Sequence, residues 1–336
     1  MKRIVIIGGG AAGLMAACRA NFMYRDGSAE ITVAEKNERP ARKLMITGKG
    51  RCNVCNNCDV DTLIANVPEN GRFLYSVFSG FAPQDVMTFF ESLSVPLKTE
   101  RGNRVFPVSD KAADIVDALV NAAKRGGARI IHGTAKNIIA ENGTVSGVML
   151  ENGKTLPADS VILATGGMSY PLTGSAGDGY KMAKALGHTV TEIRPSLTAL
   201  TAHEGFCEKL SGLSLKNITL SVFEEGRKKP VFSELGEMLF THFGISGPLV
   251  LSASAHMRRI GKKNYTAVID LKPGLTPEQL DKRILRDFEQ EKNRDFINSL
   301  DKLLPKSLIP IAVKLSGIKP DKKVSSISRE ERAALC

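Results

Sequence analysis

The sequence contains no tryptophan, and only 6% of its 336 residues are aromatic. It also lacks any stretch that approaches the roughly 18 uninterrupted apolar residues of a membrane-spanning helix, so we expect no membrane partner. Hydrophobic residues make up 43% and charged residues 24%, which is a globular composition and excludes disordered, collagenous and coiled-coil chains. A chain of this length predicts two or three packed units.

Cysteine and histidine are sparse as well. Six cysteines in a chain of this length do not form a disulfide framework, which favours a reducing compartment. Cys52, Cys55 and Cys58 have the spacing of an iron–sulfur run, but no fourth cysteine followed by proline completes it. A redox-active or metal-binding pair, Cys55 with Cys52 or Cys58, stays an alternative to ordinary loop residues. The five histidines show no HExxH or His-x-His spacing, so we expect no metal site.

The N-terminus resembles a secretion signal in one respect, because Lys2 and Arg3 precede an apolar stretch that ends near Cys18. The glycines at positions 8–10 and 13 would break the apolar helix that such a signal needs. We therefore expect the protein to be cytoplasmic.

The sequence has 46 Lys and Arg against 35 Asp and Glu, which gives a formal net charge of +11. Most of this positive excess lies after Met257. An anionic partner such as nucleic acid or a phosphorylated substrate is one reading of this excess. A solvated helical surface is the other, and it is favoured because few aromatic residues interleave the charges. We do not expect a nucleic-acid partner from charge alone.

The clearest motif is a glycine turn near the N-terminus. Residues 4–7 are an apolar β-branched run typical of a buried parallel strand, and residues 14–20 are good helix formers. Between them, Gly8 permits a tight turn, Gly10 leaves room for a pyrophosphate, and Gly13 lets the helix pack closely on the strand. The start of the helix offers unpaired N–H groups to an anion.

An acidic residue completes this unit. A second strand over residues 30–34 ends at Glu35, within the spacing expected for the carboxylate that binds the adenosine ribose hydroxyls. Strand, turn, helix, strand and acid in this order predict a dinucleotide site. NAD and FAD remain unresolved by this motif.

A series of short strands favours FAD. Residues 129–132, 135–140, 144–150 and 154–156 read as strands, with a tight turn at Asn142-Gly143. They lead into an apolar strand, residues 160–164, that ends at Thr165-Gly166-Gly167. A meander followed by a strand ending in Ala-Thr-Gly resembles the FAD domain of the glutathione-reductase class of flavoproteins, in which this loop lies by the cofactor.

Residues 42–53 (RKLMITGKGRCN) combine glycines with Lys and Arg, which suits a diphosphate. This segment, with residues 102–107 (GNRVFP), 167–180 (GMSYPLTGSAGDGY) and 239–248 (LFTHFGISGP), resembles the BaiN-type family of bacterial flavoproteins over the whole chain. Members of that family are NAD(P)/FAD-dependent oxidoreductases, some called aminoacetone oxidases and others bile-acid enone reductases.

The resemblance implies an α/β fold, in which a Rossmann-like FAD-binding domain of the glutathione-reductase class carries an inserted β-barrel-like domain and a small helical domain. We place the FAD-binding domain at residues 1–190, the β-barrel-like insert at 191–273 and the helical insert at 274–336. The sequence agrees, because β-type runs give way to a helical pattern beyond Gly274, where Thr276-Pro277-Glu278-Gln279 forms a capping box.

The motifs and the resemblance together give a set of candidate cofactor-binding residues: Gly8, Gly10, Ala12, Gly13, Glu35, Lys36, Lys43, Gly48, Gly50, Arg51, Cys52, Asn53, Ala135, Thr165, Gly166, Gly167, Gly177 and Asp178. The catalytic residue is open. His242 is the one histidine inside a family motif, with a substrate or flavin contact and a structural hydrogen bond as its two readings.

The implied function is hydride transfer from NAD(P)H through FAD to an organic substrate such as an enone, with a small molecule as the partner. A flavin oxidase acting on a small amine or ketone is an alternative, as are a non-catalytic truncated flavoprotein and a nucleic-acid-associated flavoprotein. No second GxGxxG is evident, so NAD(P)H is expected to bind only transiently. Substrate identity and oligomeric state cannot be read from the sequence.

Family members usually return to the FAD domain through a last strand and helix that carry a Gly-Glu pair near the ribityl chain. This chain shows no such segment. A second capping box, Ser328-Arg329-Glu330-Glu331, is followed by only about two turns of helix before Cys336, whereas isolated helices need roughly 12 residues. We therefore expect a C-terminally shortened chain with weaker FAD affinity than an extended one.

Overall fold

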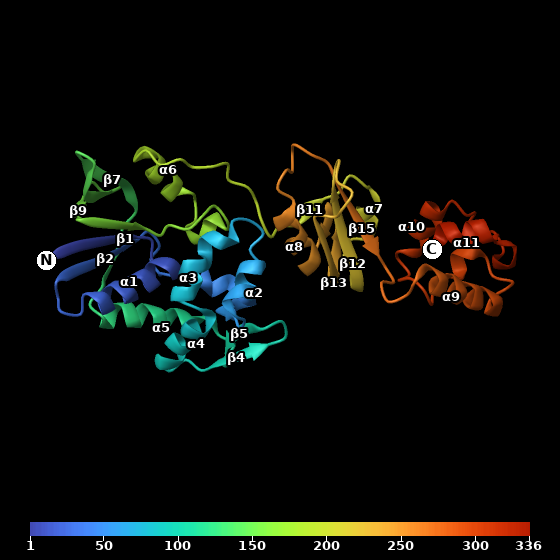
Figure 1. Cartoon of the computed structure of the whole chain (residues 1–336), viewed down its shortest axis with the longest axis horizontal. Helices are drawn as coiled ribbons and strands as arrows, with labels where there is room; N and C mark the ends of the chain where they lie inside the picture. The colour runs from blue at the N-terminus through green and yellow to red at the C-terminus, as the bar shows by residue number, and fades with distance from the viewer. The chain divides into compact units, whose positions relative to one another are not determined.

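The computed structural model describes all 336 residues, and they divide into two compact units, Met1–Glu192 and Ile193–Cys336. Each unit is described by itself (Figure 1). None of the helices is both long and apolar enough to cross a membrane.

The first unit is built on a parallel sheet of four strands in the order β10-β1-β2-β6. Its strands are β1 (Lys2–Ile7), β2 (Ala29–Glu35), β6 (Arg129–His132) and β10 (Ser160–Leu163). The register pairs Ile6 of β1 with Val33 of β2 and Ile162 of β10. The strand order changes direction beside β1, and ligands of such sheets bind outside the carboxyl ends of the strands at this point.

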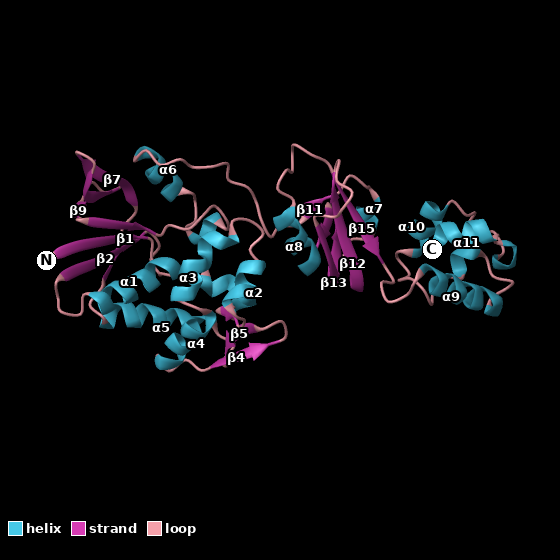
Figure 2. Cartoon of the chain, viewed as in Figure 1, coloured by secondary structure: helices cyan, strands magenta, loops and turns pink.

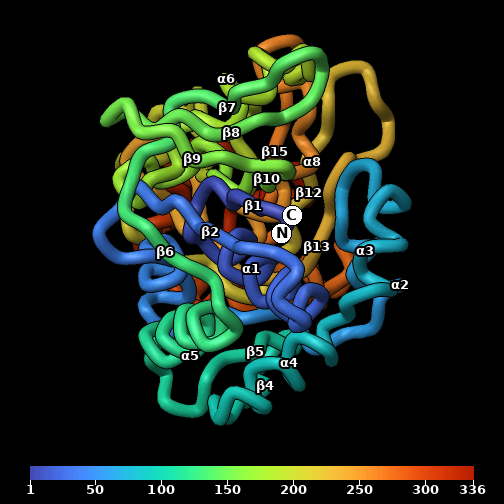
Figure 3. The backbone as a smooth tube through the Cα atoms, turned by 90° about the vertical axis from the view of Figure 1, so that its left-hand side faces the viewer, coloured from blue at the N-terminus to red at the C-terminus, as the bar shows by residue number.

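Both faces of this sheet are covered, because the successive apolar side chains of β1 point to opposite faces. Ile4 and Ile6 face helices α1 (Ala11–Met23) and α5 (Ala112–Arg125), whereas Val5 and Ile7 pack on the opposite side. That side is covered by a meander of β7 (Ala135–Glu141), β8 (Thr144–Leu150) and β9 (Thr155–Pro157), and by α6 (Asp178–Ala185). Figure 3 shows the meander on one side of β1 and β2 and the helices on the other.

A smaller sheet, β3-β5-β4, completes the first unit. Its strands are β3 (Cys55–Asn56), β4 (Leu97–Glu100) and β5 (Arg104–Pro107). The helices around it are α2 (Val60–Ala65), α3 (Tyr75–Gly80) and α4 (Pro83–Ser92). Three 3₁₀ turns complete the list: η1 (Leu44–Gly50), η2 (Gly71–Leu74) and η3 (Pro171–Thr173).

The second unit begins with an antiparallel sheet of five strands in the order β11-β14-β13-β12-β15. These are β11 (Leu200–Thr201), β12 (Ser214–Glu224), β13 (Phe232–Thr241), β14 (Gly244–Ser246) and β15 (Tyr265–Asp270). Helices α7 (Phe206–Lys209) and α8 (Pro248–His256) belong to the same part, and Leu249, Val250 and Ala253 of α8 pack into the core of the sheet.

The rest of the second unit is helical (Figure 2). Its elements are α9 (Pro277–Gln290), η4 (Phe296–Asn298), α10 (Ile309–Ser316), η5 (Val324–Ser326) and α11 (Arg329–Leu335). Both predicted capping boxes are confirmed, since Thr276 and Gln279 exchange hydrogen bonds at the start of α9, and Ser328 and Glu331 do so at the start of α11. Along the chain, the meander of the first unit is followed by the five-stranded sheet and then by these helices.

Candidate functional site

Two glycines of the N-terminal turn are required by packing. Gly8 has a φ of +106°, and a Cβ built there would lie 2.5 Å from the carbonyl oxygen of Ala164. A Cβ on Gly13 would lie 1.8 Å from the carbonyl oxygen of Gly8. These contacts let α1 start directly beside β1 and β10, as predicted for close packing of helix and strand.

Gly10 has a different environment. Its φ of −80° is available to any residue, and a Cβ built there meets no atom within 4 Å. Gly10 is the N-cap of α1 and has no side chain to cap the first N–H groups of the helix. Gly10 and Ala12 both line an open space at this helix start. A space of this kind at a helix start suits an anionic group such as a pyrophosphate.

Glu35 ends β2 and is only 6% exposed. Its Oε2 accepts a hydrogen bond of 2.6 Å from the Gly9 N–H. Its Oε1 accepts two bonds of 2.7 Å, one from the backbone N–H of Asn37 and one from the Asn37 side-chain amide. Three neutral donors thus orient the carboxylate toward the cavity, and its remaining lone pairs can accept ribose hydroxyls.

Two loops are joined beside this acid, one following β2 and one following β10. Lys36 Nζ lies 2.6 Å from Asp178 Oδ2, and Lys43 Nζ lies 2.7 Å from the buried Ser175 hydroxyl. The Asn37 amide also donates to the Thr173 carbonyl at 3.2 Å. The links bring residues more than 130 positions apart in the sequence to one wall.

These features surround one cavity of about 610 Å³ at the carboxyl ends of β1, β2 and β10. Many of the predicted cofactor residues line it: Gly8, Gly10, Ala12, Glu35, Lys36, Lys43, Ala135, Thr165, Gly166 and Asp178. Sequence reasoning missed Asn37, Arg42, Thr47, Thr134 and Ser175, which also line the cavity. Arg42, Thr47 and Ser175 lay inside motifs already recognised, whereas Asn37 and Thr134 carried no signal of their own.

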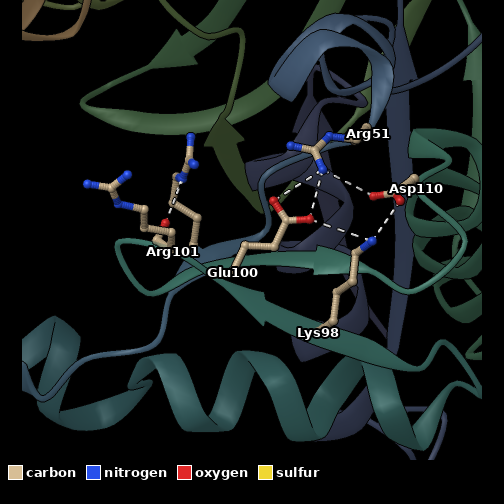
Figure 4. A network of polar contacts seen from close by, with 6 residues as sticks. Arg51, Lys98, Glu100, Arg101 and Asp110 are labelled. Atoms are coloured by element: carbon tan, nitrogen blue, oxygen red, sulfur yellow. Dashed lines mark hydrogen bonds and ion pairs between the residues drawn. The ribbon is translucent and has the colours of Figure 1, made fainter. Parts of the chain in front are cut away.

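Five of the other candidates, Gly48, Gly50, Arg51, Cys52 and Asn53, lie in a segment that does not line this cavity. The Arg51 guanidinium is 2.9 Å from Glu100 and 3.3 Å from Asp110, and its Cζ lies 4.0 Å from the centre of the Phe106 ring. Lys98 completes the network at 2.6 Å from Asp110 (Figure 4). The charge of Arg51 is thus already compensated by two carboxylates, which makes Arg51 less suited to bind a diphosphate.

Phe106 also explains the glycine at position 48. A Cβ on Gly48 would lie 3.0 Å from the Phe106 ring and 2.9 Å from the backbone nitrogen of Asn53. The ring therefore packs between the Gly48 backbone and the Arg51 guanidinium. Two motifs that are about 50 residues apart, GKGRCN and GNRVFP, form one structural unit.

Other members of the candidate set contact residues outside the cavity or adopt turn conformations. Cys52 is buried and adopts a φ of +61°, and burial raises the pKa of its thiol. With its amide nitrogen turned toward β5, Asn53 donates to the Cys55 and Val105 carbonyls. Gly50, Gly167 and Gly177 do not line the cavity, and Gly177, with a φ of +84°, precedes the start of α6.

The cysteine run does not have the environment of a reactive pair. Burial raises the pKa of the Cys55 thiol to about 11, and the pKa of Cys58 is raised by burial and by Asp59. Both thiols are therefore protonated at neutral pH, whereas attack on a disulfide requires the thiolate. The structure contains no group of three or more His, Cys, Asp or Glu residues arranged to hold a metal ion.

His242 belongs to the second unit. It is exposed in the turn between β13 and β14, where its ring meets Phe243 edge to face at a centroid distance of 5.0 Å. The cavity is lined only by residues of the first unit. A catalytic role for His242 stays a prediction.

The cavity can be tested for its fit to FAD on two observations. The empty volume over Gly10 would be filled by any side chain at that position, and the buried Glu35 carboxylate is aimed by neutral donors at the same cavity. The first suits a pyrophosphate and the second an adenosine ribose, so the residues present fit the adenine-dinucleotide half of FAD.

The chain is similar to known proteins over its whole length. The profile of the HI0933-like protein Rossmann domain matches residues 2–255, and that of the HI0933-like protein barrel and H2TH domain matches residues 194–336. The 3-dehydro-bile acid delta(4,6)-reductase of Clostridium scindens is 31% identical over 331 residues, which cover 97% of this chain and 78% of that protein. The ribosomal RNA dihydrouridine synthase of Escherichia coli is 27% identical over 334 residues, which cover 98% of this chain and 78% of that protein.

Among solved structures, L-proline dehydrogenase from P. horikoshii aligns with a TM-score of 0.34 at 15% identity, covering 80% of this chain and 81% of the other. The family assignment rests instead on the two profiles and on the relative with 31% identity. The chain belongs to the HI0933-like family of FAD-dependent oxidoreductases.

Proposed function

We propose that this protein is an NAD(P)H-linked reductase that saturates a carbon–carbon double bond conjugated to a carbonyl group. The observation that carries the cofactor part is that Glu35 and the open start of α1 line the same cavity. No second GxGxxG occurs in the sequence, so NAD(P)H is proposed to bind transiently.

The substrate class comes from the relatives. One is named for reduction of a 3-dehydro-bile acid at its delta-4,6 double bonds, and the other for formation of dihydrouridine. Uracil and a 3-keto steroid diene share one reactive unit, a double bond conjugated to a carbonyl. The two names therefore describe the same reaction, addition of a hydride and a proton across that bond.

In this proposal the residues of the chain bind and orient. Glu35 holds the ribose, the N–H groups behind Gly10 hold the pyrophosphate, and Lys43 supplies a nearby positive charge. When bound, FAD supplies hydride transfer between nicotinamide and substrate. We propose the cytoplasm as the site of action, because all six cysteines are free.

The experiment begins with the absorbance of the purified protein between 350 and 500 nm and a titration of the apoprotein with FAD. ADP should compete with FAD, since the adenine half carries the contacts described above. Anaerobic mixing with NADH or NADPH should then bleach the flavin absorbance, and an added enone should restore it. Restoration by oxygen but not by any enone would favour the oxidase alternative, and failure of both nucleotides to bleach the flavin would refute NAD(P)H linkage.

A second candidate is reduction of uridine in RNA. It is favoured by the formal net charge of +11 together with two relatives, at 27% and 28% identity, that are named as ribosomal RNA dihydrouridine synthases. Replacing the enone by an oligouridylate in the same anaerobic experiment tests it. Dihydrouridine in the recovered RNA would support it, and an unchanged oligonucleotide would count against it.

A further inference from the structure

The hairpin that joins β4 and β5 is held rigidly. Its loop is residues 101–103, between the paired residues Glu100 and Arg104, and two of the three, Gly102 with a φ of 76° and Asn103 with a φ of 57°, are left-handed. The neighbouring segment binds both carbonyls of the turn: the Asn57 N–H donates to Asn103 at 2.7 Å, and the Asn56 amide donates to Gly102 at 2.9 Å. The direction of the hairpin is therefore fixed before any partner arrives.

Charge at this hairpin is divided unequally. Glu100 and Asp110 are both engaged by Arg51 and Lys98. Arg101 in the loop and Arg104 at the start of β5 are exposed and form no ion pair. Figure 4 shows the Arg101 side chain projecting away from the compensated network.

Arg104 is kept close to Arg101 by a hydrogen bond of 3.1 Å from its Nε to the Arg101 carbonyl. Two guanidinium groups without an ion pair thus share one rigid turn. Glu100, which the sheet register places opposite Arg104, is already engaged by Arg51 and Lys98. The region has four cations, Arg51 and the three on the hairpin, against two carboxylates, which leaves a net charge of +2.

The shape of the site selects among anions. A small anionic molecule is normally bound in a concave site that buries most of its surface. Arg101 and Arg104 lie at an exposed hairpin turn and do not line the cavity described above. Two forked donors on a protruding turn fit successive oxyanions of an extended polymer, and arginine matches the geometry of phosphate.

We propose that the turn at residues 101–104 is a contact surface for the phosphodiester backbone of RNA. This inference rests on the second candidate function, reduction of uridine in RNA, and it names the surface that would hold that substrate. Phosphate contacts of this kind position a nucleic acid without reading its sequence. The turn would therefore supply affinity and register, and choice of the base would lie elsewhere.

The test compares two double variants of the holoenzyme that change charge equally. R101Q/R104Q removes the two arginines, and K228Q/K229Q removes two exposed lysines from the turn between β12 and β13. Binding of a fluorescein-labelled oligouridylate is followed by anisotropy at several KCl concentrations. R101Q/R104Q should weaken binding about tenfold and reduce the slope of log K against log [KCl] by about 1.4, because each lost phosphate contact on a single strand contributes about 0.7.

The control variant should change affinity less than about threefold and leave the slope nearly unchanged. R101K/R104K, which keeps the charges but loses the forked geometry, should recover the slope but only part of the affinity. Equal losses in the two glutamine variants would show a diffuse charge effect and overturn the proposal, as would unchanged binding by R101Q/R104Q with an unchanged melting temperature. Absence of RNA binding by the unmodified protein would overturn it too.

The binding assay contains no NAD(P)H, so its outcome is separate from that of the proposed function. RNA that binds through the turn but is not reduced would refute uridine reduction while supporting the surface. RNA that is reduced equally well by R101Q/R104Q, with unchanged KM, would refute the surface while supporting the reaction.

Discussion

Two glycine-rich segments of the first unit look alike in sequence but differ in structure. Around Gly10, the space next to the glycine is empty, and the chain around it could accept a side chain without strain. Around Gly48, the space is occupied by Phe106 and Asn53, and the backbone has a φ of +57°. A glycine therefore marks a ligand only where the structure leaves the neighbouring space open, and marks packing where the space is already filled.

Gly10→Val offers the largest expected effect on this comparison. A branched side chain would occupy the open space in front of α1, so FAD affinity should fall at least about a hundredfold, or about 2.7 kcal/mol. The melting temperature of the apoprotein should stay close to that of the parent. Flavin content after purification and FAD titration measure the affinity, and thermal unfolding measures the melting temperature.

Gly13→Val is the matched control, because its side chain would collide with the Gly8 carbonyl rather than fill open space. This variant should lose stability by about 3 kcal/mol or more, the upper range for overpacking. A Gly10 variant that still purifies yellow would show that the open space is not a pyrophosphate site.

Glu35→Ala should have the next largest effect. It removes a charged acceptor that is oriented by Gly9 and Asn37, and losing hydrogen bonds to a charged group costs about 1.5–3 kcal/mol, or about tenfold or more in FAD affinity. Glu30→Ala serves as the control, since Glu30 pairs with Arg129 at the other end of β2. Equal FAD dissociation constants for Glu35→Ala and the parent would remove Glu35 from the site.

A double-mutant cycle at Arg51 and Glu100 sharpens the second half of the comparison. If Arg51 acts by fixing residues 48–53, then R51Q and E100Q should each weaken FAD binding modestly, about threefold, and their effects should not add. The coupling expected between them is about 0.5–1 kcal/mol, since both side chains are roughly one-third exposed. A loss of affinity in R51Q with none in E100Q would instead show that Arg51 contacts the cofactor directly.

The smallest expected effect concerns pH. Asp159 accepts hydrogen bonds from the Arg3 side chain and backbone, which lower its pKa from 3.8 to about 2. A depressed pKa stabilises the fold above about pH 4, and this contribution is lost as the pH falls from about 4 to 2. Asp159→Asn should therefore flatten the loss of stability over that range.

The pair of Arg3 and Asp159 lies at the start of β1, at the opposite end from the glycine turn. FAD affinity of Asp159→Asn at pH 7 should therefore equal that of the parent. Denaturation between pH 5 and 2 and FAD titration at pH 7 check both parts. A change in FAD affinity would show that packing at one end of β1 is transmitted to the cavity.

Several features of the site were predictable because they depend on neighbours along the chain. The apolar run in β1, the turn residues after it and the acid at the end of β2 depend on local sequence, and the structure brings Gly8, Gly10 and Glu35 to one cavity. The capping boxes at Thr276 and Ser328 were equally local. In each case the residues that decide the geometry lie within a few positions of one another.

The sequence by itself thus determined the strand, turn, helix and acid of a dinucleotide unit and the order of sheet, β-rich segment and helices. Only the tertiary structure decided that Arg51 binds Glu100 and Asp110, 49 and 59 residues away, and that Lys36 and Lys43 meet Asp178 and Ser175 across more than 130 residues. The sequence around a charged residue in a glycine-rich loop does not reveal its ion-pair partner, because the pairing of distant strands and the positions of their loops decide which residues meet.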